Sequence, residues 1–132
     1  MQLEEVVMLY HVIDPYQREI RTYDLYLPHD AVLRRLVGSR SVLSQHVLVF
    51  RNQADGPDGL DLVYCAEDAV FQPNVACFSL EDSGVVFSFA GIAVVSGYCS
   101  ESECALSPRS SIQWLHEHIE WSGIRSRSHH PV

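Results

Sequence analysis

The feature that most constrains the fold is a series of short apolar or alternating runs separated by turn-forming residues. Residues 6–13 are apolar on both faces, as in a central strand, whereas residues 18–27 alternate between apolar and polar. Between them lies the turn sequence 14–17, with proline at its second position. This order predicts an antiparallel hairpin. Comparable strand-like runs follow at 46–50, 60–65, 75–80, 85–90 and 92–98.

Two segments carry the signals of helices. The first is expected over 31–37, with Asp30 as its N-cap and Gly38 as the left-handed residue that ends it. The second is expected from Ser107, as its N-cap, to Gly123. Together with the strands, they predict an α+β fold: a largely antiparallel sheet of about six or seven strands, with two helices packed on one face.

The length of 132 residues fits one domain. Residues 1–123 are expected to form a single globular α+β domain, and residues 124–132, rich in Arg, Ser and His, a polar and disordered tail. The longest apolar run, 85–95, is too short to span a membrane, and no basic-then-apolar leader follows Met1. We therefore expect a cytoplasmic protein with no membrane partner.

Charge is distributed unevenly along the chain. The segment from Asn52 to Pro108 contains nine acidic residues and neither Lys nor Arg. Residues 1–51 hold six acids and six Arg, so the net charge of −8 arises in the middle of the chain. A field of one sign concentrates oppositely charged partners and speeds their association. This pattern favours a basic protein partner and argues against nucleic acid.

No constellation of residues in the sequence fixes a reaction. His116 and His118 lie about 200° apart on a helix, which is poor placement for sharing a metal ion. All nine basic residues are Arg, through genomic bias or through selection, so no lysine amine exists for a Schiff base or a phosphate loop. We expect no catalytic residues, no metal and no cofactor.

The four cysteines show no metal-binding spacing. Cys65 and Cys77 lie in strand-like runs and are expected to be buried apolar side chains. Cys99 and Cys104 enclose a short polar loop; we expect free thiols in a cytosolic protein, with a disulfide as the alternative in an oxidising compartment.

The order of elements resembles that of small α+β immunity proteins of bacterial polymorphic toxin systems. The resemblance covers about residues 30–124. A short helix, Asp-Ala-Val-Leu-Arg-Arg-Leu at 30–36, precedes the strand His-Val-Leu-Val-Phe at 46–50. Strands with acidic loops follow, and Leu-Ser-Pro at 106–108 introduces the last helix, through Trp-Leu at 114–115 to Trp-Ser-Gly at 121–123.

The resemblance implies an inhibitor that neutralises a cognate toxin, of the nuclease or deaminase type, by occluding its basic active-site cleft. Acidic side chains would form charge-assisted hydrogen bonds with the toxin, and an aromatic side chain would anchor the contact. Under this hypothesis the partner-binding residues are Asp55, Asp58, Asp61, Tyr64, Glu67, Asp68 and Phe71.

Two other functions stay open. One is a phage or pathogen protein that binds and inhibits a host factor acting on nucleic acid. The other is an enzyme or small-ligand-binding protein with a pocket lined by Tyr10, His11, Tyr26 and Trp114. Exposure of Trp114 or Trp121 would also favour a homodimer or a partner groove.

Overall fold

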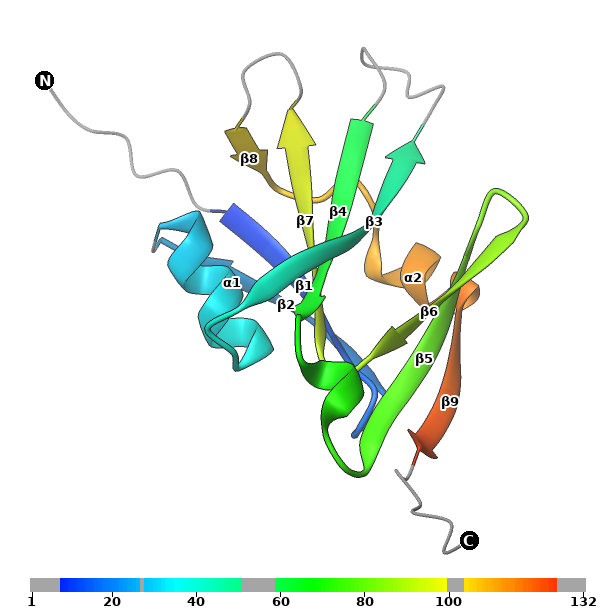
Figure 1. The fold of residues 1–132 in the computed structure, drawn as a ribbon. Coiled ribbons are helices and arrows are strands. Elements are labelled where there is room, and N and C mark those ends of the chain that lie inside the picture. Colours follow the sequence, from blue (N-terminus) through cyan, green and yellow to red (C-terminus); the bar gives the residue numbers. More distant parts are fainter. Residues whose placement is uncertain (1–7, 27, 51–58, 100–103, 126–132) are drawn as a thin grey trace, which may run out of the picture.

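Two antiparallel sheets packed against each other form the framework of the protein (Figure 1). The computed structural model describes residues 8–26, 28–50, 59–99 and 104–125. Its elements, in chain order, are β1 Met8–Asp14, β2 Glu19–Leu25, α1 His29–Val37, β3 Val42–Phe50, β4 Gly59–Ala66, the 3-10 turn η1 Ala69–Phe71, β5 Val75–Asp82, β6 Val85–Ala90, β7 Ala93–Cys99, β8 Cys104–Leu106, α2 Ile112–His118 and β9 Ile119–Arg125.

The larger sheet has the strand order β2-β1-β7-β4-β3, with β8 paired to β7 beyond the end of β1. The smaller sheet has the order β6-β5-β9. The predicted α+β class and the antiparallel pairing are confirmed. The strands nevertheless divide between two sheets, whereas the sequence indicated one.

The two hairpins that the sequence predicted are confirmed. Strands β1 and β2 pair from Met8 with Leu25 to Asp14 with Glu19. The Asp14 carboxylate accepts hydrogen bonds from the backbone N–H groups of Tyr16 and Gln17, at 2.9 and 3.2 Å, and so holds the turn. Strands β5 and β6 are joined by Ser83 and Gly84, both at positive φ, as the favoured two-residue hairpin turn requires.

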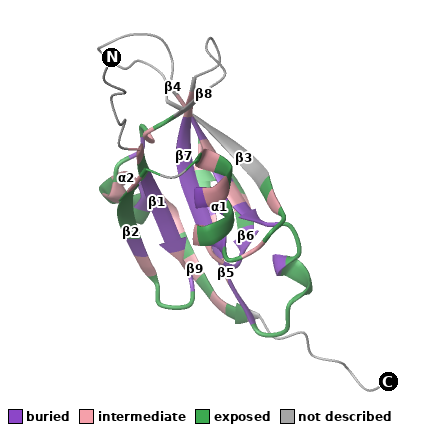
Figure 2. Ribbon diagram, turned by 90° about the vertical axis from the view of Figure 1, so that its left-hand side faces the viewer, coloured by how far each residue is buried: buried purple, intermediate pink, exposed green. Residues whose placement is uncertain are grey.

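The inner strands β1 and β7 of the larger sheet are buried on both faces, because the two helices lie on opposite sides of this sheet. Residues 10–13 of β1 are all buried, and β7 is buried over most of its length (Figure 2). Val12 packs in one core cluster with Val32 of α1, whereas Ile13 packs in another with Leu115 of α2. Because successive strand residues point to opposite faces, α1 covers one face, and α2 with the smaller sheet covers the other. The expected packing of both helices on one face is therefore wrong.

Helix α1 begins earlier than predicted. Its N-cap is Pro28, whose carbonyl accepts a hydrogen bond from the Val32 N–H at 3.0 Å, and Asp30 lies in the first turn instead. A carboxylate there still interacts favourably with the helix dipole. The predicted end is confirmed: Gly38 is left-handed, with φ of 78°, and its N–H donates to the Arg34 carbonyl.

Helix α2 is shorter than predicted, and the segment after it is a strand. Its N-cap is Ser111, whose side-chain oxygen accepts a hydrogen bond from the Trp114 N–H at 3.0 Å. The helix ends at His118, and β9 then pairs with β5. The alternation that places Ile119 and Trp121 on the core side fits a strand as well as a helix, and pairing with β5 decides between them.

Gly123 was expected to end the second helix and instead lies at a β-bulge. The β5–β9 register shifts here, because Cys77 pairs with Gly123 and Phe78 with Trp121. Gly123 has φ of 79°, a conformation that suits glycine at such a bulge. Residues 124 and 125 continue β9, and residues 126–132 of the expected tail lie outside the described residues.

Strand β8 was not predicted and brings the following segment close to β7. Gly97 pairs with Leu106, and Cys99 pairs with Cys104. The expected free thiols at Cys99 and Cys104 stay a prediction. A Cβ atom on Gly97 would collide with the backbone carbonyl of Ser107. Glycine at this position therefore allows the segment after β8 to cross the strand.

We expect Gly97→Ala to lower the free energy of unfolding by at least about 2 kcal/mol, because the added methyl group meets backbone, which cannot move aside like a flexible side chain. Urea denaturation followed by circular dichroism measures this change. Ser88→Ala, at an exposed position of β6, is the control and should change stability by less than about 0.5 kcal/mol. Equal stability of the two variants would contradict the close approach at Gly97.

Candidate partner-binding surface

The seven predicted partner-binding residues do not form one surface. Asp55 and Asp58 lie outside the described residues. Asp61 of β4 is completely buried. Tyr64 is half-buried, and three residues at and before η1 are exposed: Glu67, Asp68 and Phe71.

Asp61 is a structural residue, which corrects its assignment to a partner surface. Its carboxylate accepts three hydrogen bonds, from the Arg109 N–H at 2.8 Å, the Ser110 N–H at 2.9 Å and the Ser110 hydroxyl at 2.7 Å. A buried carboxylate needs such donors to offset its loss of hydration. The carboxylate thus holds the segment before α2 against β4 and presents nothing to a partner.

His11 joins the same buried cluster from β1. Its Nε2 lies 2.7 Å from the Ser110 carbonyl oxygen, which can only accept, so Nε2 carries the proton. Its Nδ1 lies 2.8 Å from the Thr22 hydroxyl, which donates to it when the ring is neutral. Burial lowers the pKa of His11, partly opposed by the Ser110 carbonyl and by the charge of Asp61. Both ring nitrogens are occupied, so His11 is a structural residue.

The three exposed residues Glu67, Asp68 and Phe71 form a surface that we call the η1 surface. The side chain of Phe71 is 61% exposed. The turn is fixed by a hydrogen bond from the Phe71 N–H to the Asp68 carbonyl at 3.0 Å, and the Glu67 N–H donates to the Ser41 carbonyl at 2.9 Å. A hollow of ≈ 500 Å³ lies between these side chains and the α1–β3 connection, lined by Ser39, Arg40, Ser41, Glu67, Asp68 and Phe71.

Tyr64 lies beside the η1 surface and is partly engaged in the core. Its ring makes an edge contact with His29, at 5.9 Å between ring centroids, and His29 Nδ1 lies 3.1 Å from the Tyr10 hydroxyl. Burial raises the pKa of Tyr64 and lowers that of His29. A smaller hollow lined by Tyr64 also includes Arg40, so the two hollows adjoin at that arginine.

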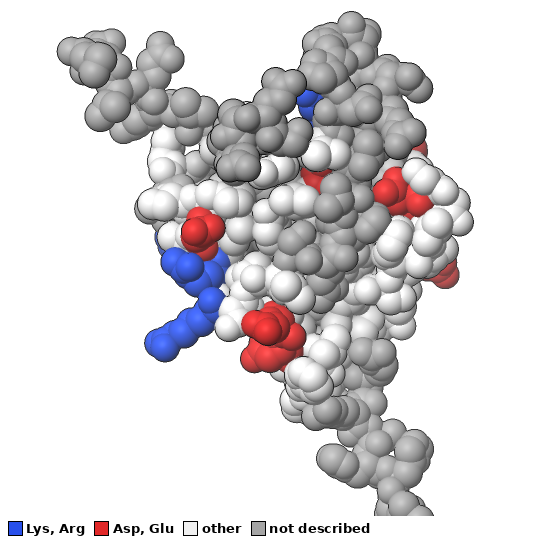
Figure 3. Space-filling view, turned by 45° about the horizontal axis from the view of Figure 1, so that its top comes forward, with Lys and Arg blue, Asp and Glu red and all other residues white. Residues whose placement is uncertain are grey.

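The described acidic residues of the middle segment do not form one continuous face. Glu67 and Asp68 lie at one end of β5, and Glu81 and Asp82 at the other, before the hairpin turn. Arg40 also lines the hollow of the η1 surface, and Figure 3 shows basic side chains over the α1 region with acidic ones on either side of them. A run of acids in the sequence thus becomes separate acidic groups, one of them beside arginine.

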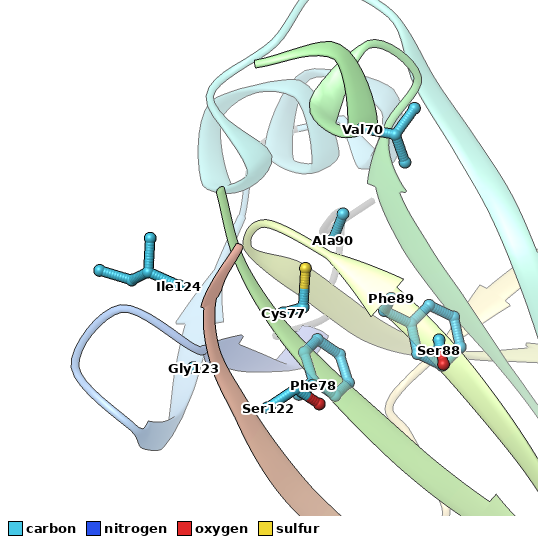
Figure 4. A pocket seen from close by; sticks show the side chains of 9 residues that line it. All are labelled: Val70, Cys77, Phe78, Ser88, Phe89, Ala90, Ser122, Gly123 and Ile124. Atoms are coloured by element: carbon cyan, nitrogen blue, oxygen red, sulfur yellow. The ribbon is translucent and has the colours of Figure 1, made fainter. Parts of the chain in front are cut away.

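A second hollow of ≈ 550 Å³ lies over the smaller sheet. Figure 4 shows Cys77 at its base, between the neighbouring strands, with Val70 of η1 at one end and Ile124 of β9 at another. Its lining residues are Val70, Cys77, Phe78, Ser88, Phe89, Ala90, Ser122, Gly123 and Ile124. Sequence reasoning missed this hollow because its residues come from four separate elements.

The residues of the alternative ligand pocket do not gather in the structure. Tyr10 and His11 are neighbours on β1 and point to opposite faces of the larger sheet. Tyr26 is 64% exposed. The Trp114 ring stacks on the His118 ring, with 4.1 Å between the ring centroids. These four residues therefore line no common concavity.

Other candidate chemical groups have structural roles. His118 Nδ1 lies 2.7 Å from the Trp114 carbonyl oxygen in the last turn of α2. Cys65 is buried, and this burial raises the pKa of its thiol to about 12, so the thiol stays protonated at neutral pH. Cys77 is half-buried. Within the described ranges, no group of three His, Cys, Asp or Glu side chains is placed to hold a metal ion.

Neither helix of this part of the chain has the length and apolar character needed to cross a membrane.

No protein-family model, no curated protein and no solved structure matches this chain. Its function is therefore inferred from its own residues.

We expect Asp61→Ala to lower the free energy of unfolding by about 3 kcal/mol or more, because three hydrogen bonds to Arg109 and Ser110 are lost in a buried place. Chemical denaturation measures the change. Asp24→Ala, at an exposed position of β2, is the matched control and should cost less than about 0.5 kcal/mol. A small effect of Asp61→Ala would show that its carboxylate is not the anchor of this segment.

Stability should also fall in mild acid because of His11. Its pKa is lowered in the folded state, so below a pH of about 6.5 the unfolded chain binds a proton that the folded one resists. The free energy of unfolding therefore falls as the pH decreases from about 7 to 5. In His11→Gln, the decrease in the free energy of unfolding between pH 7 and pH 5 should be smaller than in wild type. This comparison does not depend on the stability of the variant at neutral pH. An equal decrease in the variant and in wild type would show that His11 is not the group that causes the loss of stability in acid.

Proposed function

We propose that the chain is a protein-binding inhibitor that docks on a basic protein through the η1 surface. The observation that carries the proposal is the exposed aromatic ring of Phe71 beside two exposed carboxylates at the rim of a hollow. Aromatic anchors with polar surroundings dominate the energetics of many protein interfaces. Tyr64 and Arg40 extend this surface on its α1 side.

Charge supports a basic partner. A net charge of −8 accelerates the approach of a positively charged protein, and Glu67 and Asp68 supply carboxylates for Lys or Arg at contact. Arg40 at the same hollow would face an acidic group of the partner and fix its orientation. The partner class that fits best is a protein acting on nucleic acid, since such proteins have basic clefts that an acidic protein can occlude.

Within this class, we propose the immunity role, in which the chain acts in the cytoplasm and neutralises a cognate nuclease or deaminase toxin. Phe71 would enter the cleft of the toxin, and the two carboxylates would pair with its basic residues. Inhibition of a host factor by a phage or pathogen protein would use the same physical contacts and differs only in the identity of the target.

The test is affinity capture with matched variants, followed by an inhibition assay. Tagged wild type, Phe71→Ala and a Glu67→Gln/Asp68→Asn double variant are exposed to lysate of the source cell and eluted with a salt gradient. We expect a basic protein that binds Phe71→Ala about 30-fold more weakly than wild type. The double variant should release it at lower salt. Wild type should also suppress cleavage or deamination of an oligonucleotide by the captured protein.

The control is Asp24→Asn/Glu117→Gln, which removes the same two charges from exposed positions of β2 and α2. It should retain the captured protein as wild type does. Equal retention by all four proteins would remove the η1 surface from the interface.

A further inference from the structure

Strand β6 forms one edge of the smaller sheet, and its hydrogen-bonding pattern can be assigned from the hairpin. Asp82 and Val85 flank the two-residue turn and form its closing, hydrogen-bonded pair. Backbone groups of Val85 and of every second residue after it thus point toward β5. The Gly91 N–H, which donates to the Ala76 carbonyl at 2.8 Å, continues this alternation. The N–H and C=O groups of Val86 and Ser88 therefore point outward at the exposed part of the edge, whereas Ala90 is buried in the core.

The β6 edge lacks the features that usually prevent strand addition. Protein edge strands commonly carry Lys or another charge, a proline or a β-bulge. The sequence Val-Val-Phe-Ser-Phe-Ala at 85–90 has no charge and no proline, and its register with β5 is regular. Val85 and Val86 are 53% and 63% exposed. The edge is thus apolar, regular and open at its start.

The far end of the edge adjoins the second hollow, over the smaller sheet. Ser88 and Ala90 line the second hollow together with Val70 of η1, whose side chain is 44% exposed (Figure 4). A strand added along β6 would place alternate side chains on this face of the sheet. Its basic side chains would lie on this face, with Val86 and Glu81, and its apolar side chains on the opposite face, beside Val85 and Phe87.

Charge around the edge selects the kind of strand. Glu81 lies opposite Val86 in the β5–β6 register, and Asp82 lies opposite Val85. Elements β5, β6, α2 and β9 hold four acids and, apart from Arg125 at the end of β9, neither Lys nor Arg. An added strand would lie about 10 Å from Glu81, two strand spacings away, within reach of a Lys or Arg side chain. A second copy of this chain would bring like charges together instead.

We propose that the β6 edge binds an extended segment of another protein, with Lys or Arg alternating with apolar residues, as an added β-strand. Backbone hydrogen bonds to Val86 and Ser88 supply the affinity, and the neighbouring carboxylates supply the preference for basic side chains. This interaction surface is separate from the η1 surface and goes beyond the function proposed above.

The probe is a capped peptide of about ten residues that alternates Lys and Val, compared with one that alternates Lys and Pro. Both have the same charge, but only the first can form a strand ladder. Calorimetry should give a dissociation constant at least about tenfold lower for the Lys–Val peptide. Amide hydrogen exchange by NMR should slow at Val86 and Ser88. Equal binding of the two peptides would overturn the proposal.

Ser88→Pro is the sharpest variant, because proline removes the outward N–H and leaves the residues that face β5 unchanged. It should weaken binding of the Lys–Val peptide at least about tenfold, whereas Ser88→Ala should bind like wild type. Val86→Lys, which places a like charge at the edge, should weaken binding similarly, with Val86→Thr as its control. Circular dichroism verifies that each variant is folded. If Ser88→Pro does not fold, Val86→Lys tests the proposal in its place.

The Glu67→Gln/Asp68→Asn variant separates this proposal from the previous one. It should bind the Lys–Val peptide as wild type does. Loss of peptide binding in that variant would place the peptide on the η1 surface and overturn the assignment to β6. Sedimentation of the protein alone tests whether a second copy occupies the edge instead. A monomer–dimer equilibrium that Ser88→Pro abolishes, in a protein that does not bind the peptide, would overturn the proposal of a basic segment.

Discussion

A single buried carboxylate connects the parts of this fold that are most distant in the sequence. Asp61, near the start of β4, accepts hydrogen bonds from the backbone N–H groups of Arg109 and Ser110, and the Ser110 carbonyl accepts one from His11 of β1. Helix α2 begins directly afterwards, with Ser111 as N-cap, and its Leu115 enters the core. The position of α2, and of β9 after it, therefore depends on this cluster.

Strands β1 and β7 are buried on both faces and present no side chains to a partner over most of their length. The two proposed binding surfaces lie elsewhere, one at a connection and one at a sheet edge. At η1, Ala69 is buried, close enough to Gly91 that a Cβ atom there would lie 3.3 Å from the Ala69 side chain. This packing fixes the buried side of the turn, while Phe71 stays 61% exposed.

Local signals predicted the parts of the fold that local chemistry determines. The Asp14 turn, the Ser83–Gly84 turn and the left-handed Gly38 each follow from residues next to one another. The limits of α2 could not be predicted, because Ser107 and Ser111 can each cap the start of a helix. At the other end, the apolar spacing fits both helix and strand. Pairing with β5, some forty residues earlier, decides it.

The candidate site was only partly predictable for a related reason. Glu67, Asp68 and Phe71 follow one another in the chain, and the structure keeps them together. Asp61 does not belong to the exposed surface, because it is buried and accepts hydrogen bonds from Arg109 and Ser110. These residues are far from it in the sequence, so a count of charges along the chain does not reveal the contact. Arg40 comes from a segment whose charges balance, yet the α1–β3 connection brings it to the same hollow. Charge along a sequence thus predicts the sign of a partner better than the shape of a surface.

The most direct test of the central claim is hydrogen–deuterium exchange of the protein alone and in complex with its captured basic partner. The account predicts slower exchange at residues 67–72, around Phe71, in the complex. Slower exchange confined to β2 and α2, with 67–72 unchanged, would contradict it.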